Sequence, residues 1–572
     1  MASRNGTVLS LNNVAAPHCM QVPHGPRLNC FLSTHGVANY LNIPYARIPA
    51  RWRTAQPLDL ADLPADSKLD ATQYGPRCPQ PPDPLHIVMA HMFERLSMEQ
   101  YTAEFSCLTV NIYTPKDIPP ETQLPVLAWI HGGAFRAGDN TTEFDGNHLV
   151  ARSVALEQPI VVVTINYRLG LLGFLTSREI ECEALTASES HVCNQGSNDQ
   201  KLALLWIQRH IALFGGDPDR VTVAGESAGA MSVHVLLRCR TTVPLFARAV
   251  VCSSPAMAAS LRPASKGQAH FDALVTAAGV SVTAPYQVKL AALRSYSADE
   301  LLELHPPALA AELPTPFVDP AWLDDGEHGP LHDGVLPPAD YWSRLPAWCT
   351  EIVVGTTKDE LALFCATPET AALSEDAVQN KLGSVVSSDP AAPNHALQDA
   401  IWSTPALQAA TTPFGRLVTF GTHLVFRGPA HAFAAAVHRQ CPNHRVYLYS
   451  IDIVDPFPGT LSGFAWHSFG NAILFYQPAC QRDAELARTA DLVSVAHIGL
   501  LHGQASAVWE PFGVAGERIS WNGSRTAMVP TGLVPSDPVR EHLETLGDES
   551  LLQAYDDFAS DPSRVARVAL FC

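Results

Sequence analysis

The chain has 572 residues, of which 47% are hydrophobic and 16% are charged, so it holds enough apolar material for one large buried core. Its 37 lysines and arginines stand against 56 aspartates and glutamates, a formal net charge of −19 at pH 7. A charge of this sign repels phosphate backbones and anionic lipid surfaces, which argues against nucleic acid or a membrane surface as a partner.

The sequence carries no sign of export or membrane insertion. The opening segment, MASRNGTVLSLNNVAAPHC, has its apolar residues interrupted by serine and asparagine. A secretory signal needs roughly 7–15 continuous apolar residues, and a membrane-spanning helix needs roughly 18. Neither run is found, so we expect a cytoplasmic protein without a membrane span.

Neither repeats nor linkers divide the chain. Its 35 glycines and 46 prolines are spread out and form no low-complexity tract. Its 13 cysteines include no CxxC pair and no Cys/His cluster at zinc spacing, so no metal or other cofactor is expected. We expect one globular domain over residues 1–572.

The order of apolar runs predicts an α/β protein. Residues 28–46 alternate in polarity and predict antiparallel strands at one edge of a sheet. The clearest helix covers 197–218, where Ser197 or Asn198 caps the start and Gly215 helps to end it. Strands that alternate with helices predict a mostly parallel sheet with both faces covered. The buried parallel strands are expected at 125–133, 159–167, 220–225, 247–254, 351–357 and 445–453.

Two stretches do not follow this rhythm. Residues 256–345 are rich in alanine, leucine and proline, and residues 375–440 resemble several short helices. Insertions of this kind usually sit over the carboxyl ends of the strands, where ligands bind in open α/β sheets. We interpret both as helical cap insertions.

Residues 225–229, Gly-Glu-Ser-Ala-Gly, lie between a β-branched run and helix-forming residues. A sharp strand-to-helix turn strains its central residue and brings the flanking positions so close to other backbone that only glycine fits. The turn would expose the Ser227 hydroxyl at the helix N-terminus, where free N–H groups favour an anion. Five letters can also match by chance, but the flanking strand and helix favour Ser227 as a nucleophile.

Residues 131–135, His-Gly-Gly-Ala-Phe, directly follow the first predicted parallel strand. Residues with little side chain let backbone N–H groups turn toward one point, as the oxyanion of an acyl-transfer reaction requires. An ordinary glycine-rich turn is the alternative interpretation, and the serine turn further along favours the first.

Five segments together resemble one known family. GESAGA, HGGAF, NIPYA, SCLTVNIYTP and DQKLALLWIQRHIALFGGDP are similar to the type-B carboxylesterase/lipase family, which includes cholinesterases, fungal lipases and para-nitrobenzyl esterases. The similarity runs from about residue 30 to about residue 255 and recurs in short segments afterwards. It implies the α/β-hydrolase fold, with lid or cap excursions at about 78–107, 256–345 and 375–440.

The resemblance also implies partners for the serine. The family's acid lies in a segment matched here by GTTKDE, which gives Glu360, although from the residues alone its neighbour Asp359 could also orient an imidazole. The family's histidine is matched by His467 in FAWHSFG, with Ser468 where glycine is common.

These assignments imply a mechanism. His467 takes the proton of Ser227, which attacks an ester carbonyl, while Glu360 orients the imidazole. By resemblance, the oxyanion hole consists of the N–H groups of Gly133, Ala134 and Ala228. Glu226 resembles a buried structural acid of the family and receives no chemical role.

One structural pair of the family has changed. Phe105 and Ser106 stand where relatives have Glu-Asp before the cysteine at 107. The resemblance therefore implies that Arg51 or Arg53 has lost its acid partner, for which Glu104 would be an imperfect substitute.

Cys78 and Cys107 resemble a family disulfide. The sequence leaves their redox state open, because thiols stay reduced in the cytosol. The loop between them corresponds to a lid or gorge wall in relatives, so its apolar residues either contact substrate or pack against the body. These residues are Met89, Met92, Phe93 and Leu96. The loop has no tryptophan to hold a quaternary ammonium, which argues against a choline ester.

Three functions follow from these residues. The first is a serine carboxylesterase that hydrolyses a neutral, hydrophobic ester or lactone, with a small-molecule ester as its partner and an oligomeric state left open. The second is an acyltransferase, macrolactonising or dimerising enzyme that uses the same acyl-enzyme. The third is a non-catalytic binding protein on the same fold, which the presence of all three triad residues disfavours.

Overall fold

The structure is a computed structural model. It describes residues 14–83, 85–93, 101–119, 122–189, 193–255, 261–310, 312, 314–319, 322–323, 345–365, 367–387, 394–505, 509–513, 517–523, 525–530 and 538–559.

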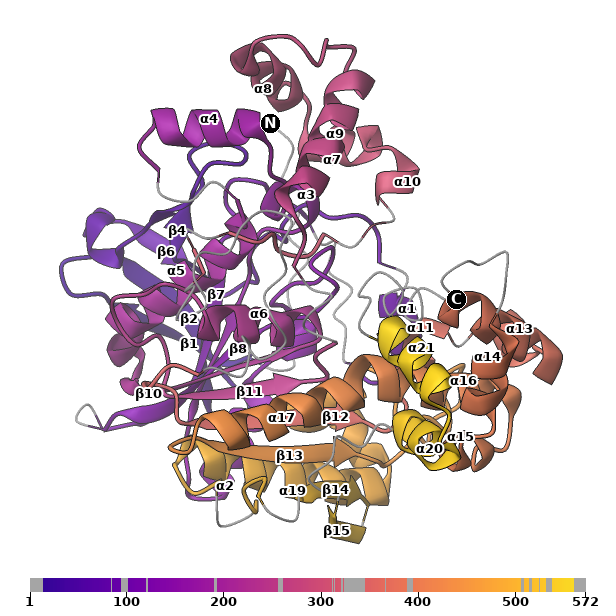
Figure 1. Cartoon of the computed structure of the whole chain (residues 1–572). Coiled ribbons are helices and arrows are strands. Elements are labelled where there is room, and N and C mark those ends of the chain that lie inside the picture. The colour runs from indigo at the N-terminus through magenta and orange to yellow at the C-terminus, as the bar shows by residue number, and fades with distance from the viewer. Residues whose placement is uncertain are drawn as a thin grey trace.

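Six parallel strands form the centre of one large sheet (Figure 1). They lie in the order β9, β8, β10, β11, β12 and β13, and every neighbouring pair is parallel. All residues of β8, β9 and β12 are buried, as the β-branched runs predict for strands covered on both faces. The six predicted parallel strands are thus confirmed. Their bounds are Leu124–Ile130 (β8), Val161–Ile165 (β9), Gly216–Glu226 (β10), Arg248–Cys252 (β11), Glu351–Thr357 (β12) and Arg445–Ile451 (β13).

Further strands extend this sheet at both edges. The predicted antiparallel strands at the N-terminal edge are confirmed: β1, β2, β3 and β7 lead in that order to β9. A hairpin closes the opposite edge, in which β14 is parallel to β13 and β15 is antiparallel to β14. Their bounds are Val14–Gln21 (β1), Arg27–Ser33 (β2), Val37–Pro44 (β3), Thr109–Pro115 (β7), Glu517–Asn522 (β14) and Arg525–Pro530 (β15). The short strands are Ala46–Arg47 (β4), Gln56–Pro57 (β5) and Lys68–Asp70 (β6).

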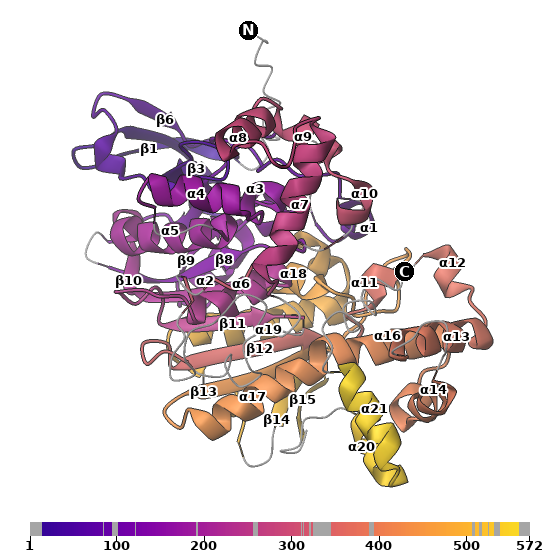
Figure 2. The same ribbon diagram turned by 45° about the horizontal axis from the view of Figure 1, so that its top comes forward.

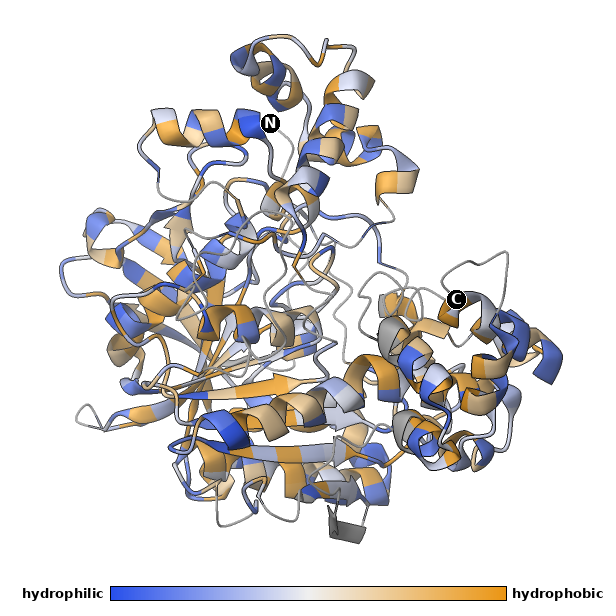
Figure 3. Ribbon diagram, in the orientation of Figure 1, coloured by the Kyte–Doolittle hydropathy of each residue, from blue (hydrophilic) through white to orange (hydrophobic). Residues whose placement is uncertain are grey.

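The sheet separates two hydrophobic cores. Along β8, Leu127 and Trp129 belong to one core, whereas Val126, Ala128 and Ile130 belong to the other, because successive strand residues point to opposite faces. Figure 3 shows β11 largely in orange and the helices with mixed colours. One core is covered by α2 (Asn147–Ala155) and α19 (Ala484–Leu501), and the other by α5 (Gln195–His210), α6 (Ala228–Leu237) and α17 (Gly428–Gln440).

Helix α5 begins before the predicted caps. Ser197 and Asn198 are buried inside it, and its N-cap is Asn194, a left-handed residue with φ 55°. The Asn194 side chain does not cap the helix, because its amide bonds both backbone groups of Phe317, at 2.6 and 2.8 Å. The predicted cap was wrong because polar residues of this first turn lie in the interior. At the other end, Gly215 has φ 82° and ends the helical segment as expected.

The two predicted insertions form separate groups of helices (Figures 1 and 2). The first group consists of α7 (Ala264–Ala277), α8 (Tyr286–Arg294), α9 (Ala298–Leu304) and α10 (Pro307–Ala310). The second consists of α11 (Ala362–Cys365), α12 (Pro368–Ala371), α13 (Glu375–Val386), α14 (His395–Trp402), α15 (Pro405–Gln408) and α16 (Pro413–Thr422), followed by the π-helical turn His423–Arg427. Helix α17 was also placed in this insertion, but Phe433, Ala434 and Val437 pack in the same core as β13 residues. The remaining helices are α1 (Leu85–Met89), α3 (Gly170–Gly173), α4 (Arg178–Thr186), α18 (Phe469–Leu474), α20 (Pro538–Leu546) and α21 (Glu549–Ala559).

Arg51 has kept an acid partner, contrary to the expectation from the sequence. Its Nε and Nη2 atoms each donate to Glu104 at 2.7 Å, and its Nη1 donates to the carbonyl of Leu293 at 2.9 Å. The two side chains are only 5% and 9% exposed. Glu104 serves as the acid partner of Arg51, because a shift of one position in a loop is small compared with the reach of an arginine.

We expect Glu104→Ala to lower the free energy of unfolding by about 3 kcal/mol, since it leaves the buried Arg51 charge without its partner. Chemical denaturation measures this change. The matched control is Glu485→Ala, which removes the exposed Arg488–Glu485 pair and should cost below about 1 kcal/mol. Equal effects of the two variants would contradict this account.

The described part of the loop that begins at Cys78 packs against the body. The sulfurs of Cys78 and Cys107 lie 2.6 Å apart and both residues are buried free cysteines. Met89, Met92 and Phe93 are buried in one of the two cores. Leu96 lies outside the described residues. In the described part of the chain, we find no helix with the length and apolar character needed to cross a membrane.

Candidate active site

Ser227 lies between β10, which ends at Glu226, and α6, which begins at Ala228. Its backbone has φ 55° and ψ −120°, a strained conformation for a residue with a side chain. Two backbone hydrogen bonds hold it there: its N–H donates to Cys252 at 3.0 Å, and its carbonyl accepts from Met231 at 2.9 Å. The strand, the helix and the neighbouring strand β11 therefore fix the serine together.

Glycines on both sides make this turn possible. A Cβ on Gly225 would lie 2.5 Å from the backbone of Gly229, and one on Gly229 would lie 2.1 Å from the carbonyl oxygen of Ile130. Both distances are too short for any real side chain. The close backbone approach expected of the G-x-S-x-G motif is present.

His467 and Glu360 form a buried pair. Nδ1 of His467 donates to Oε2 of Glu360 at 2.7 Å, and the other carboxylate oxygen accepts the N–H of Thr357 at 2.7 Å. Both side chains are buried. Because a carboxylate only accepts, Nδ1 carries the proton and Nε2 is the basic nitrogen of the neutral ring.

Asp359, the alternative acid, does not contact the ring. Its Oδ2 accepts the N–H of Ala465 at 3.0 Å, and its own N–H donates to the Ala465 carbonyl at 2.9 Å. These two bonds fasten the turn after β12 to the segment that carries His467. Asp359 thus positions the histidine loop, and Glu360 is the acid on the ring.

The basic nitrogen of His467 faces Glu226. Its Nε2 lies 3.1 Å from Oε1 of Glu226, and that same oxygen accepts a hydrogen bond from the Ser468 hydroxyl at 2.8 Å. Within the described residues Nε2 makes no hydrogen bond, to Ser227 or to any other group. Since Glu226 precedes Ser227 and Ser468 follows His467, this contact brings the serine and histidine segments side by side.

The two carboxylates change the basicity of His467. Burial alone would lower the pKa of the imidazole, but Glu226 and Glu360 together outweigh it and raise the pKa above 6.5. Burial also raises the pKa of Glu226, against the opposing effect of His467. The site holds a buried histidine that favours its protonated form more than a free histidine does.

The turn after β8 contains consecutive residues with positive φ: Gly133 at 95°, Ala134 at 56° and Phe135 at 57°. The Gly133 carbonyl accepts the N–H groups of Arg136 and Ala137, both at 2.9 Å, and so closes the turn. In the part of the chain that the structure describes, the N–H groups of Gly133, Ala134 and Ala228 donate to no backbone acceptor.

This turn lies directly beside the serine. A Cβ on Gly132 would be 2.7 Å from the Glu226 carboxylate and 3.1 Å from Cβ of Ser227. Unpartnered N–H groups next to a strained serine are what stabilisation of an oxyanion requires. The structure therefore brings the predicted serine turn and the predicted donor turn together.

Two residues of this site were not given a role from the sequence, namely Glu226 and Ser468. Glu226 could have been suspected because it adjoins the serine in the motif. Ser468 has φ 70°, a left-handed conformation that explains why glycine is common at this position. The serine accepts that conformation and gains its hydrogen bond to Glu226.

Among the described residues, no cluster of three or more histidine, cysteine, aspartate or glutamate side chains is placed to hold a metal ion.

A mostly parallel sheet with a serine at a strand-to-helix turn, and with an acid and a histidine after later strands, defines an α/β-hydrolase. The chain belongs to the carboxylesterase family, whose sequence profile matches residues 24–491. It is a hydrolase of carboxylic esters.

Similar proteins support this assignment. The para-nitrobenzyl esterase of Bacillus subtilis (strain 168) is 31% identical over 433 residues, which cover 73% of this chain and 75% of that protein. Liver carboxylesterase 1 of Oryctolagus cuniculus is 37% identical over 300 residues, about half of each chain. A solved structure of a PNB esterase superimposes on this chain with a TM-score of 0.68 and 26% sequence identity. The superposition covers 92% of this chain and 99% of the PNB esterase chain.

Proposed function

We propose that the protein is a serine carboxylesterase that hydrolyses a neutral, hydrophobic carboxylic ester or lactone through an acyl-enzyme on Ser227. The observation that carries this proposal is the 2.7 Å hydrogen bond from His467 Nδ1 to Glu360 beside the strained serine. That bond places a proton on Nδ1, so Nε2 is the basic nitrogen of the neutral ring, and it lies against Glu226, the residue before Ser227.

The reaction follows from these contacts. Nε2 of His467 accepts the Ser227 proton as the serine oxygen attacks the ester carbonyl, and Glu360 stabilises the imidazolium that forms. The N–H groups of Gly133, Ala134 and Ala228 bind the oxyanion, each worth about 3 kcal/mol of the barrier. His467 then protonates the leaving alcohol, and a water molecule activated by the same nitrogen releases the acid.

The surroundings of the base support a neutral, apolar substrate. The rings of Phe364 and Phe426 each lie 5.0 Å from the imidazole of His467. Glu226 places a carboxylate one residue from the nucleophile, which disfavours an anion close to the reacting carbonyl. The reacting part of the substrate is therefore uncharged and hydrophobic.

A panel of p-nitrophenyl esters graded by acyl chain length tests the proposal. The wild-type protein should release p-nitrophenol and free acid from at least one member, whereas Ser227→Ala should not. Adding an alcohol acceptor and following the products by mass tells hydrolysis from acyl transfer. Absence of turnover on every ester, or transfer to the alcohol as the main product, would overturn the hydrolase proposal.

The pH dependence should report the contact with Glu226. Hydrolysis needs neutral His467, so kcat/KM falls as the pH falls through the raised pKa of this histidine. We expect Glu226→Gln to lower that pKa and to move the acid limb of the kcat/KM profile to lower pH. Glu485→Gln, at an exposed position, should leave the limb in place. A limb that stays fixed or moves upward in Glu226→Gln would contradict the assigned electrostatic role.

A further inference from the structure

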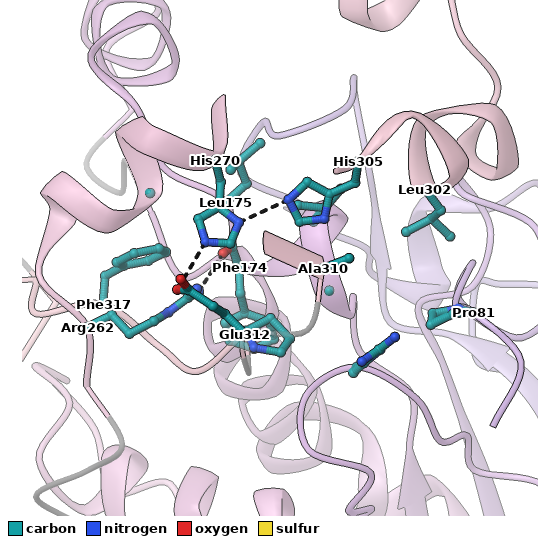
Figure 4. Close-up of a pocket in the computed structure, with 15 residues that line it drawn as sticks. Pro81, Phe174, Leu175, Arg262, His270, Leu302, His305, Ala310, Glu312 and Phe317 are labelled. Carbon is teal, nitrogen blue, oxygen red and sulfur yellow. Dashed lines mark hydrogen bonds and ion pairs between the residues drawn. The ribbon is translucent and has the colours of Figure 1, made fainter. Parts of the chain in front are cut away.

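A pocket lies outside the residues that carry the proposed reaction (Figure 4). It is a hollow of about 600 Å³, part of which is open to solvent. Its walls come from distant parts of the chain: Arg136 after the donor turn, α3 and the residues after it, α7, and the segment from α9 to Phe317. Ser227, Glu360 and His467 do not line it.

The pocket is positively charged in a strongly acidic protein. Two arginines, Arg136 and Arg262, stand against one carboxylate, Glu312, whereas the whole chain has a net charge of −19. Glu312 is also engaged already, because its oxygens lie 3.5 Å from Nζ of Lys266 and 3.4 Å from Nε2 of His270. A local excess of positive charge on an acidic protein favours an anion at this place.

The two arginines differ in how far their guanidinium groups are already engaged by other residues. Arg262 is fixed: Nε donates to the carbonyl of Thr315 at 2.9 Å, Nη2 donates to that of Phe174 at 3.0 Å, and the guanidinium lies 4.2 Å from the Phe317 ring. Arg136 is exposed, and its guanidinium has no carboxylate partner among the described residues. It is therefore the cation that a ligand can reach.

A chain of hydrogen bonds forms one wall. His270 contacts Glu312 through Nε2 and His305 through Nδ1, the latter at 3.0 Å, as the dashed lines in Figure 4 mark. Burial, then His270 and then Arg136 lower the pKa of His305 to about 4. The histidines are neutral near pH 7, so the charge that selects the ligand comes from Arg136, and the depressed pKa is consistent with its guanidinium lying near His305.

The remaining lining is mainly apolar. Leu171, Phe174, Leu302 and Phe317 contribute aliphatic and aromatic surface around the charged groups. An apolar pocket with one available cation suits a ligand that has a hydrocarbon part and a single negative charge. Arginine binds a carboxylate well because its planar fork matches the two oxygens.

We propose that this pocket is an accessory binding site for a small hydrophobic carboxylate. The carboxylate pairs with Arg136, and the hydrocarbon part lies against Leu171, Leu302 and Phe317. The ligand belongs to the chemical class of acids that ester hydrolysis releases, and its site is distinct from the one assigned to Ser227.

The pocket is joined to the donor turn. Gly170, in its wall, donates its N–H to the Phe135 carbonyl at 2.7 Å, and the ring of Phe174 lies 4.9 Å from that of Phe135. Phe135 directly follows Ala134. A bound carboxylate thus contacts residues that hold the oxyanion donors in place, so its binding changes kcat for a neutral ester as well as KM.

Titration calorimetry with octanoate tests the site. The protein is Ser227→Ala, so binding is read without turnover and independently of the proposed reaction. We expect one octanoate per chain and clearly weaker binding of the neutral octanamide. Adding Arg136→Ala should weaken octanoate binding roughly tenfold or more, since it removes a charge-assisted pair. Leu302→Trp, which fills the pocket, should weaken it as well.

The control is Arg439→Ala, an exposed arginine in the last turn of α17, which should leave octanoate binding unchanged. If Arg136→Ala and Leu302→Trp bind octanoate as well as the parent does, the acid binds only near Ser227 and the proposal is wrong. No binding at all would also overturn it.

A second arm distinguishes a free acid from the far end of a substrate. The wild-type enzyme is compared on p-nitrophenyl octanoate and on the mono-p-nitrophenyl ester of octanedioic acid. If Arg136→Ala lowers kcat/KM for the charged ester alone, the carboxylate belongs to a substrate. If Arg136→Ala leaves kcat/KM for both esters unchanged but abolishes the effect of added octanoate on kcat, the carboxylate belongs to a free acid.

Discussion

Ser227→Ala should lower the turnover of a p-nitrophenyl ester by roughly 10⁴-fold or more while the protein stays folded. The loss is large because no other hydroxyl occupies the strained turn between β10 and α6. The backbone bonds that hold position 227 do not involve its side chain, so the turn survives the substitution. Steady-state kinetics with circular dichroism on the same samples measure both parts of the prediction.

Ser232→Ala is the matched control on the same helix. Its hydroxyl donates to the Ala228 carbonyl at 2.9 Å and accepts from Gln200 at 2.9 Å, so it affects packing and takes no part in the chemistry. Its kcat/KM should remain within a few-fold of the wild type. Undiminished turnover in pure Ser227→Ala would remove the nucleophile from the mechanism.

Glu360→Gln should lower kcat by roughly 10⁴-fold with little change in shape. The N–H of Thr357 donates to one oxygen of Glu360, so a glutamine turns its carbonyl oxygen there and its NH₂ toward His467. The amide then donates to Nδ1, which forces the ring proton onto Nε2. A histidine protonated at Nε2 cannot accept the proton of Ser227, and the base is lost.

Asp359→Asn is the comparison that decides which acid serves the ring. An asparagine can still accept the N–H of Ala465 through its carbonyl oxygen, so the loop keeps its position. We expect this variant to keep most of its activity. A large loss in Asp359→Asn together with near-normal activity in Glu360→Gln would reverse the assignment.

The sequence predicts the centre of this protein well. Strands buried on both faces must be apolar throughout, so β8, β9 and β12 appear as uninterrupted β-branched runs. The serine turn can be predicted equally well, because the close backbone approach at Gly225 and Gly229 allows no residue other than glycine at these positions. Such features are set by local geometry, which restricts the residue types at consecutive positions of the sequence.

Contacts between distant segments cannot be predicted from the sequence in this way. Glu104 meets Arg51, Glu226 meets His467, and Asn194 bonds Phe317 rather than capping its own helix. Each of these contacts depends on the positions of two separate segments in the folded chain. A difference of a few ångströms in those positions decides whether the side chains meet. The pocket beside Arg136 is the extreme case, since Arg136, Arg262 and His305 share no motif and meet only through the packing of α3, α7 and α9.

The most direct test is to map the site of covalent labelling by a fluorophosphonate. This probe reacts with a serine only when a neighbouring base has activated it. We predict one adduct per chain, located by peptide mass spectrometry on Ser227, much slower labelling in Glu360→Gln, and none in Ser227→Ala. A protein that hydrolyses esters while its adduct forms on another residue, or forms no adduct, would contradict the central claim.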